Sequence, residues 1–182
     1  MNILLIEDQA GFAEPIKEFL QACGHIVTWI IGAHRLEPSR VIGIIPSANP
    51  DPREDSWNGD YSRLVTVDLA GFKLAFVDGG LVGTIKSGWD IVPTLTAHGI
   101  ICIAISGGGA SSPTFLKAGA SIALPKELVV LALRSGNLNP KEAVENPELI
   151  ASRLPTYIAG LRSAQGRHEP LDYGFPKLAW MF

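Results

Sequence analysis

Five short runs of almost entirely apolar residues recur along this chain, and they restrict the fold more than any other feature of the sequence. A strand with one face in water alternates apolar and polar residues, whereas a strand buried on both faces is apolar throughout. Runs of the second kind predict a parallel sheet covered on both sides. They lie at residues 2–6, 25–31, 73–77, 100–105 and 121–124.

The segments between these runs carry a helical pattern. Residues 11–24 place apolar side chains at helical spacing and end at Gly24, a residue type common at helix ends. Two more such segments, 87–99 and 111–120, separate the last three runs, and in the second Ser112 is expected as the N-cap with Pro113 at the first helical position. The alternation predicts a flavodoxin-like, doubly wound α/β fold with five parallel strands in the order 2-1-3-4-5.

Residues 40–72 stand where the second helix of such a fold is expected. Two β-like runs, 41–45 and 64–68, flank a loop rich in Pro, Asp, Asn and Gly, which predicts a β-hairpin with a long tip. We therefore expect an insertion at about residues 33–72. Long structured loops often carry function, and Trp57 and Tyr61 near the tip are residue types enriched at binding hot spots, although packing against the domain is an equal alternative.

Beyond the last apolar run, the sequence predicts helices and an apolar tail. Asn139-Pro140 and Asn146-Pro147 are helix-start signals, and Glu142 completes a pattern similar to a capping box. The final residues, 173–182, include four aromatic side chains and must dock on this chain or on a partner. We expect one domain over residues 1–135 and a helical extension with an apolar tail over 136–182.

Composition narrows the class of protein. A formal net charge of -3 gives no electrostatic case for binding nucleic acid, and residues 136–182 are too few and too weakly basic for a separate DNA-binding domain. No apolar run approaches the roughly 20 residues needed to cross a bilayer, and Glu7 and Asp8 interrupt the first run where a secretory signal would continue. Cys23 and Cys102 have neither metal-like nor disulfide-framework spacing. We expect a cytoplasmic protein that binds neither nucleic acid nor membrane.

Polar side chains follow the apolar runs at the points where the strands should end. Glu7 and Asp8 follow the first run, Asp78 the third, Ser106 the fourth, and Lys126 lies just after the fifth. In this type of fold, ligands bind beyond the carboxyl ends of the strands, next to the place where the strand order reverses. The five side chains are therefore expected at one edge of the sheet.

Three carboxylates brought together at this edge would need a cation. Two carboxylates about 4 Å apart repel each other by about 4 kcal/mol at an effective dielectric near 20. An all-oxygen cluster with room for water suits Mg²⁺. The predicted ligands are Glu7, Asp8 and Asp78, with a backbone carbonyl such as that of Gly80 and waters completing the shell.

Four short motifs in this order resemble the receiver domain of two-component response regulators. They are IED at residues 6–8, FVD at 76–78, AIS at 104–106 and GASIALPK at 119–126. The resemblance implies that Asp78 accepts a phosphoryl group from a histidine kinase or phosphotransfer protein while Glu7 and Asp8 hold the metal. It also implies that Ser106 and Lys126 bind phosphoryl oxygens.

The chain also departs from the receiver pattern. Ala123 occupies the position where receivers commonly have a Tyr or Phe that changes rotamer on phosphorylation, and Pro125 precedes the lysine instead of following it. The leading hypothesis is a stand-alone receiver-like signalling protein that acts through an unknown downstream protein, with homodimerisation left open. The alternatives are an atypical pseudo-receiver that is not switched by phosphorylation, and a binder of small anions at Gly107, Gly108 and Gly109.

Overall fold

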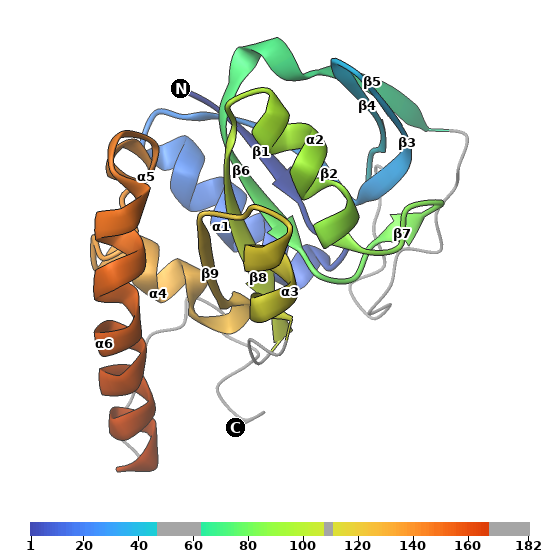
Figure 1. Ribbon diagram of the computed structural model, residues 1–182. Helices are drawn as coiled ribbons and strands as arrows, with labels where there is room; N and C mark the ends of the chain where they lie inside the picture. Colours follow the sequence, from blue (N-terminus) through green and yellow to red (C-terminus); the bar gives the residue numbers. More distant parts are fainter. Residues whose placement is uncertain (47–62, 108–110, 168–182) are drawn as a thin grey trace.

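A computed structural model describes residues 1–46, 63–107 and 111–167. Its centre is a five-stranded parallel sheet in the order β2-β1-β6-β8-β9 (Figure 1). In chain order within this sheet, that is the predicted 2-1-3-4-5 arrangement, and the predicted fold class is confirmed. The strands are β1 (Asn2–Ile6), β2 (Ile26–Ile30), β6 (Phe72–Asp78), β8 (Ile101–Ser106) and β9 (Ile122–Pro125).

Helices cover the two faces of this sheet. Helix α1 (Ala10–Ala22) and helix α4 (Val129–Arg134) pack on one face, together with α5 (Pro140–Glu145) and α6 (Pro147–Gly166). Helices α2 (Val92–Ala97) and α3 (Ser112–Lys117) pack on the other. Single 3₁₀ turns lie at η1 (Leu69–Gly71), η2 (Gly88–Asp90) and η4 (Lys126–Leu128). None of the helices among these residues is long and apolar enough to cross a membrane.

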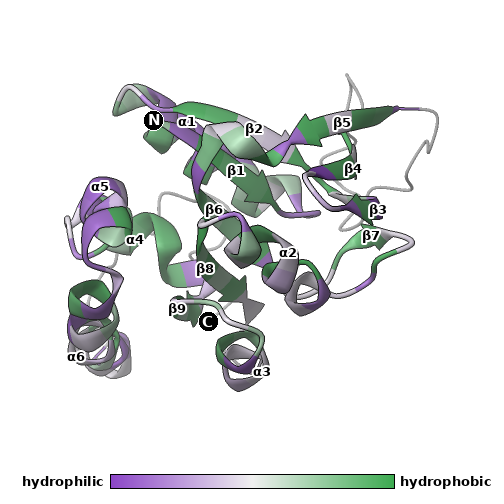
Figure 2. Ribbon diagram, turned by 45° about the horizontal axis from the view of Figure 1, so that its top comes forward, coloured by the Kyte–Doolittle hydropathy of each residue, from purple (hydrophilic) through white to green (hydrophobic). Residues whose placement is uncertain are grey.

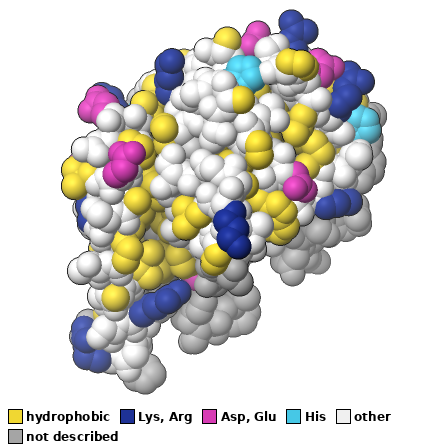
Figure 3. Space-filling view, viewed as in Figure 1, with side chains coloured by type: hydrophobic (Ala, Val, Ile, Leu, Met, Phe, Trp, Pro, Cys, Tyr) yellow, Lys and Arg dark blue, Asp and Glu magenta, His cyan; other side chains and the backbone are white. Residues whose placement is uncertain are grey.

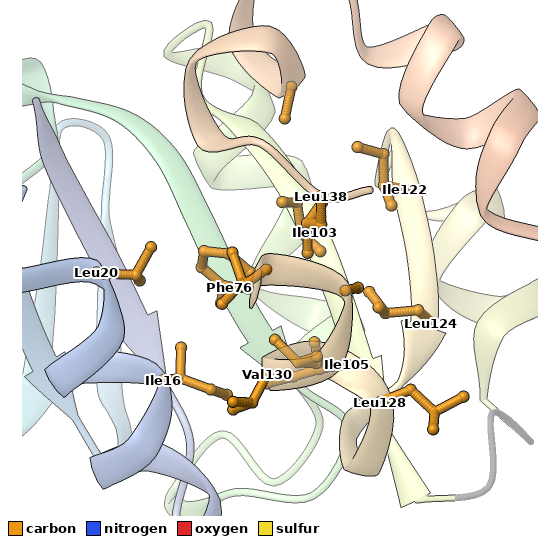
Figure 4. Packing of buried hydrophobic residues seen from close by; sticks show 14 of the residues in the cluster. Ile16, Leu20, Phe76, Ile103, Ile105, Ile122, Leu124, Leu128, Val130 and Leu138 are labelled. Carbon is orange, nitrogen blue, oxygen red and sulfur yellow. The ribbon is translucent and has the colours of Figure 1, made fainter. Parts of the chain in front are cut away.

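The apolar strands form a core on each side of the sheet because their side chains alternate between its faces. Phe76 and Ile105 face α1 and α4, as Figure 4 shows from close by, whereas Val77 and Ala104 belong to the opposite cluster. The central strands are hydrophobic along their length (Figure 2). This agrees with the prediction of a sheet buried on both faces.

A second, four-stranded sheet occupies the place predicted for a hairpin. It has the order β5-β4-β3-β7 and consists of β3 (Gly32–Glu37), β4 (Arg40–Ile44), β5 (Leu64–Asp68) and β7 (Val82–Gly83). The antiparallel pair β4–β5 is the predicted hairpin, and Val41 faces Val67 across it. The sequence did not predict β3 or β7. We call this second sheet sheet B.

Sheet B covers the same face of the central sheet as α2 and α3. Val41 and Val67 belong to the same buried cluster as Ile30 of β2. The contact is close, since a methyl group added at Gly43 would lie 2.9 Å from Cγ2 of Ile30. Sheet B therefore replaces the second helix of the fold as the layer over this part of the core.

The two C-terminal helices begin where the sequence predicts. The side chain of Asn139 accepts from the backbone N–H of Glu142, and that of Asn146 accepts from the N–H of Leu149. The carboxylate of Glu142 pairs with Arg153 of α6, so it does not complete a capping box. Helix α3 starts at Ser112 with Ser111 as its N-cap, and no side chain caps it, so the predicted N-cap was one residue too late.

Helix α6 packs along β9, the edge strand, and buries Ile150 and Leu154 in the core. On the face shown in Figure 3, acidic and basic groups are interspersed, and hydrophobic side chains gather between α6 and the rest of the molecule. A groove of about 170 Å³ lies there, bordered by Ala123 of β9, Leu116 of α3 and Ile158 of α6.

Candidate metal and phosphoryl site

The five polar residues predicted to converge do meet at the carboxyl edge of the central sheet. Glu7 and Asp8 follow β1, Asp78 ends β6, Ser106 ends β8, and Lys126 follows β9. Glu7, Asp78, Ser106 and Lys126 are all buried, at 0%, 3%, 4% and 6% exposure. Burial of four polar side chains, three of them ionisable, at one sheet edge is uncommon unless the groups pair with one another or hold an ion.

The carboxylates of Glu7, Asp8 and Asp78 come close enough to share one ion. One oxygen from each lies within 4.8 Å of the other two. The ammonium of Lys126 lies 3.2 Å from Oε1 of Glu7 and 3.4 Å from Oδ1 of Asp78. Lys126 therefore offsets one of three negative charges, and the cluster keeps a net negative charge when all its members are ionised.

Burial is the main cause of raised pKa values among the three acids of this cluster. Burial, and then the charge of Asp78, raise the pKa of Glu7 to about 8 and that of Asp8 to about 6. Burial also raises the pKa of Asp78, against the opposing effect of Lys126 and the N–H groups of Gly79 and Gly80. Burial alone would lower the pKa of Lys126, but its acidic neighbours, Glu7 first, raise it.

The hydrogen bonds of Glu7 satisfy only one of its two carboxylate oxygens. Its Oε1 accepts from the backbone N–H of Gln9 at 2.9 Å and from Lys126. Its Oε2 is buried and has no hydrogen-bond partner among the described residues. Because a buried carboxylate oxygen without a partner is costly, this atom and the charge excess together fit a divalent cation with oxygen ligands.

A pocket of about 440 Å³ opens above the cluster. Asp8, Asp78, Ser106 and Lys126 line it, but Glu7, which lies deeper, does not. Its other lining residues come from the three connections that follow β1, β6 and β8: Gln9, Gly79, Gly80, Lys86, Ser87, Trp89, Gly107 and Ser111. Of these, the sequence patterns singled out only Gly80 and Gly107. Lys86, Ser87 and Trp89 reach the pocket because the loop after β6 folds back, which no motif encodes.

Lys126 has a further neighbour that the sequence analysis did not identify. Its ammonium lies 4.8 Å from the ring centre of Phe12, on the first turn of α1. A cation over an aromatic face is attracted by the electrons of the ring. Phe12 and the two carboxylates together hold the ammonium at the floor of the pocket.

Backbone hydrogen bonds close the loop after Asp78. The N–H of Gly80 donates to Oδ2 of Asp78 at 3.1 Å, and the N–H of Gly88 donates to the carbonyl of Gly79 at 3.1 Å. Gly88 lies so close to the backbone of Asp78 that an added methyl group would be 1.9 Å from its carbonyl oxygen. Within this loop, strand β7 pairs in parallel with β3 of sheet B. The loop that follows the candidate phosphoacceptor is therefore also an edge of sheet B.

Some residues singled out in the sequence lie outside the described part of the chain. These are Trp57 and Tyr61 in the insertion, Gly108 and Gly109 of the glycine run, and the apolar tail from residue 168 onward. Gly107 is described and lines the pocket.

Comparison with known proteins identifies the fold. No family model matches the sequence, and neither does any curated protein. The structure is similar to a CheY-like response regulator receiver domain protein from Methanospirillum hungatei JF-1. The two are 18% identical, the match covers 81% of this chain and 96% of the other, and the TM-score is 0.53.

Further solved structures also resemble the chain. One is the receiver domain of a sensor histidine kinase from Pseudomonas aeruginosa PAO1, with a magnesium ion coordinated in its active site cleft. It is 17% identical over 74% of this chain and 92% of that domain, with a TM-score of 0.48. The similarity to the protein from Methanospirillum hungatei shows that the chain has the receiver fold, and the predicted resemblance is confirmed in the architecture.

Proposed function

We propose that this chain is a receiver-type signalling protein that accepts a phosphoryl group on Asp78 while Glu7, Asp8, Asp78 and the backbone carbonyl of Gly80 hold Mg²⁺. One observation carries the proposal. Three carboxylates converge within 4.8 Å of one another at the edge of a receiver fold, and the ammonium of Lys126 contacts two of them. The oxygen of Glu7 that has no hydrogen-bond partner in the described part of the chain and the excess negative charge of the cluster fit a divalent cation.

The transfer itself is a displacement at phosphorus. An oxygen of Asp78 forms a bond to phosphorus as the P–N bond to the donor histidine breaks. The electron pair of that bond goes to the imidazole nitrogen, which then takes up a proton. The product is an acyl phosphate on Asp78, and the receiver is its own phosphorylation catalyst, acting on no other substrate.

The residues of this chain supply charge and position for that displacement. Lys126, already held beside Asp78, pairs with a phosphoryl oxygen, and the hydroxyl of Ser106 donates to another. Asp78 is oriented by the N–H of Gly80. Bound Mg²⁺ supplies the positive charge that lets one anion approach another.

The proposed phosphodonor is a histidine kinase or a phosphotransfer protein, and the output is contact with a downstream protein. A second candidate function, a pseudo-receiver that binds partners without being switched by phosphate, is favoured by one observation. Ala123 borders the groove beside α6, so no aromatic side chain at that position can change rotamer when Ser106 moves.

A third candidate, binding of a small anion at the glycine run, has less support. Gly107 lines the same pocket as Asp78, so an anion there would compete with a phosphoryl group and would not occupy a separate site. Competition between inorganic phosphate and the donor would reveal it.

The direct test is phosphoryl uptake by the wild type and Asp78→Asn. Protein is incubated with acetyl phosphate and Mg²⁺, and intact mass is measured over time. We expect one phosphoryl group on the wild type and none on Asp78→Asn, because the amide cannot form the acyl phosphate.

The controls separate the candidate functions. Omitting Mg²⁺ should abolish uptake, and Asp68→Asn, at an exposed position of strand β5, should label as the wild type does. A wild type that binds Mg²⁺ but takes up no phosphoryl group would support the pseudo-receiver. A wild type that binds neither would refute the site as a metal centre.

A further inference from the structure

The pocket above Asp78 contains a second lysine that the proposed chemistry does not use. Lys86 lines this pocket together with Lys126, but the two lysines differ in their surroundings. Lys126 is buried against Glu7 and Asp78, whereas Lys86 is exposed and has no ion-pair partner among the described residues. Lys86 is therefore the cation of the pocket that remains available to a ligand.

The backbone of Lys86 is fixed in place although its side chain is exposed. Its carbonyl accepts from the N–H of Leu81 at 3.0 Å, across the loop that follows Asp78. The N–H of the preceding residue, Ile85, donates to the carbonyl of Ala33 in β3 at 3.1 Å. Ser87 forms a bridge with Gly80. Lys86 is thus presented at the rim of the pocket by a loop that is closed on itself.

Sheet B braces this loop. Strand β7 pairs with β3, and the contact is so close that a methyl group at Gly32 would lie 2.0 Å from the carbonyl oxygen of Val82. Thr84 also contacts the ring of His34 at 3.0 Å. The insertion that replaces the second helix therefore positions the loop that carries Lys86.

The charges of the site show why a second lysine matters. With Glu7, Asp8 and Asp78 ionised, Lys126 and one Mg²⁺ bring the net charge of the cluster to zero. Lys126 is already shared between Glu7 and Asp78, so little of its charge is left for an arriving dianion. Lys86 makes the pocket net positive at its mouth, where a phosphate group enters.

We propose that Lys86 is a phosphodonor-binding residue, whose ammonium pairs with the phosphoryl oxygens of an incoming acyl phosphate or phosphohistidine, and that sheet B serves to present it. This inference rests on the proposed function of Asp78. With acetyl phosphate, the bond from an Asp78 oxygen to phosphorus forms while the P–O bond to acetate breaks, and acetate leaves with the electron pair. Lys86 binds the donor before transfer and takes no part in the bond changes.

The test variant is Lys86→Met, which keeps most of the length of the side chain and removes its charge. One lysine in a water-filled pocket changes the affinity of a doubly charged ion by about fivefold at low ionic strength. We expect the acetyl phosphate concentration for half-maximal labelling to rise about fivefold. We also expect Mg²⁺, titrated without a donor, to bind up to about fivefold more tightly, because a repelling charge is gone.

These opposite changes separate a binding role from a structural one. Loss of loop structure would weaken both Mg²⁺ and donor binding. Lys73→Met is the matched control, since Lys73 is an exposed lysine near the opposite end of β6 from Asp78. Lys73→Met should change neither the acetyl phosphate concentration for half-maximal labelling nor the affinity for Mg²⁺. Raising the salt concentration to about 0.5 M should remove most of the difference between Lys86→Met and the wild type.

The outcomes also separate this inference from the proposed function. If the wild type is labelled and Lys86→Met is labelled with the same half-saturation, Lys86 has no donor-binding role and the function of Asp78 stands. If both Mg²⁺ and donor binding weaken, Lys86 is structural. If the wild type takes up no phosphoryl group, the proposed function fails and this inference fails with it.

Discussion

Replacing Glu7 by Gln should stabilise the metal-free protein at neutral and alkaline pH. Glu7 is fully buried beside two other carboxylates and one lysine, and its pKa is raised from 4.5 to about 8. A glutamine keeps an oxygen that can accept from Gln9 and Lys126, and it removes one of the repelling charges. Lys126 would still face the carboxylate of Asp78 at 3.4 Å.

The size of the effect follows from the shift in pKa. Below pH 4.5, Glu7 is protonated in both the folded and the unfolded chain, so it imposes no penalty. As pH rises from 4.5 to 8, the unfolded chain loses the proton while the folded chain retains it, so stability falls by about 1.4 kcal/mol per pH unit. At pH 7 the penalty is about 3 kcal/mol, which corresponds to about 10 °C in melting temperature for a domain of this size.

The assay is thermal unfolding in a chelator at pH 5, 6, 7 and 8. We expect the wild type to lose stability as pH rises, and the curve of Glu7→Gln to be flatter and higher at pH 8. At a hundred times its dissociation constant, Mg²⁺ should raise the free energy of unfolding of the wild type at pH 8 by about 2.7 kcal/mol. It should raise that of Glu7→Gln by less. A Glu7→Gln variant that is less stable than the wild type at pH 8 without metal would contradict this prediction, because Glu7 would then be a net stabilising partner of Lys126.

Three further predictions follow from single contacts. Gly88→Ala should lower stability by about 3 kcal/mol in urea unfolding, because its methyl group would collide with the backbone of Asp78, whereas Gly80→Ala has open space and should cost under about 1 kcal/mol. Equal unfolding midpoints for the two would show that the loop is packed differently. Asp8→Asn should abolish stabilisation by Mg²⁺ in thermal melts, and an unchanged response would exclude Asp8 as a ligand. Arg153→Met should cost about 1 to 2 kcal/mol, because Arg153 links α6 to the loop before α5 and to Glu142. Breaking the exposed ion pair between Arg35 and Glu37 should leave the free energy of unfolding nearly unchanged. Similar losses of stability from replacing either arginine would contradict this prediction.

The central sheet and the convergence of its polar residues were accessible from the sequence because both depend on short-range patterns. Runs such as residues 73–77 are apolar throughout, which predicts burial on both faces, and parallel strands bring their carboxyl ends to one edge. Asp78 and Lys126 could therefore be placed at the same edge although they lie far apart in the chain. The local signals at Asn139 and Asn146 likewise located the starts of α5 and α6.

Strands β3 and β7 were not predicted, for a physical reason. Residues 32–37 mix glycine, histidine, arginine and glutamate without regular alternation, and β7 has two residues, so neither carries a strand signal of its own. They are strands because their backbone groups find partners in one another and in β4. Such pairing depends on which segments the fold brings together.

The layers of the fold and the edge at which its charged groups meet follow from the amino-acid sequence, through hydrophobic periodicity and the geometry of parallel strands. Which other residues share that edge depends on the three-dimensional packing. Phe12 lies against Lys126 because α1 packs against β2 and α4, and Lys86 reaches the pocket because sheet B holds its loop. Those contacts join segments that are distant in the chain, and the energy that selects them comes from packing and backbone pairing, which no local pattern records.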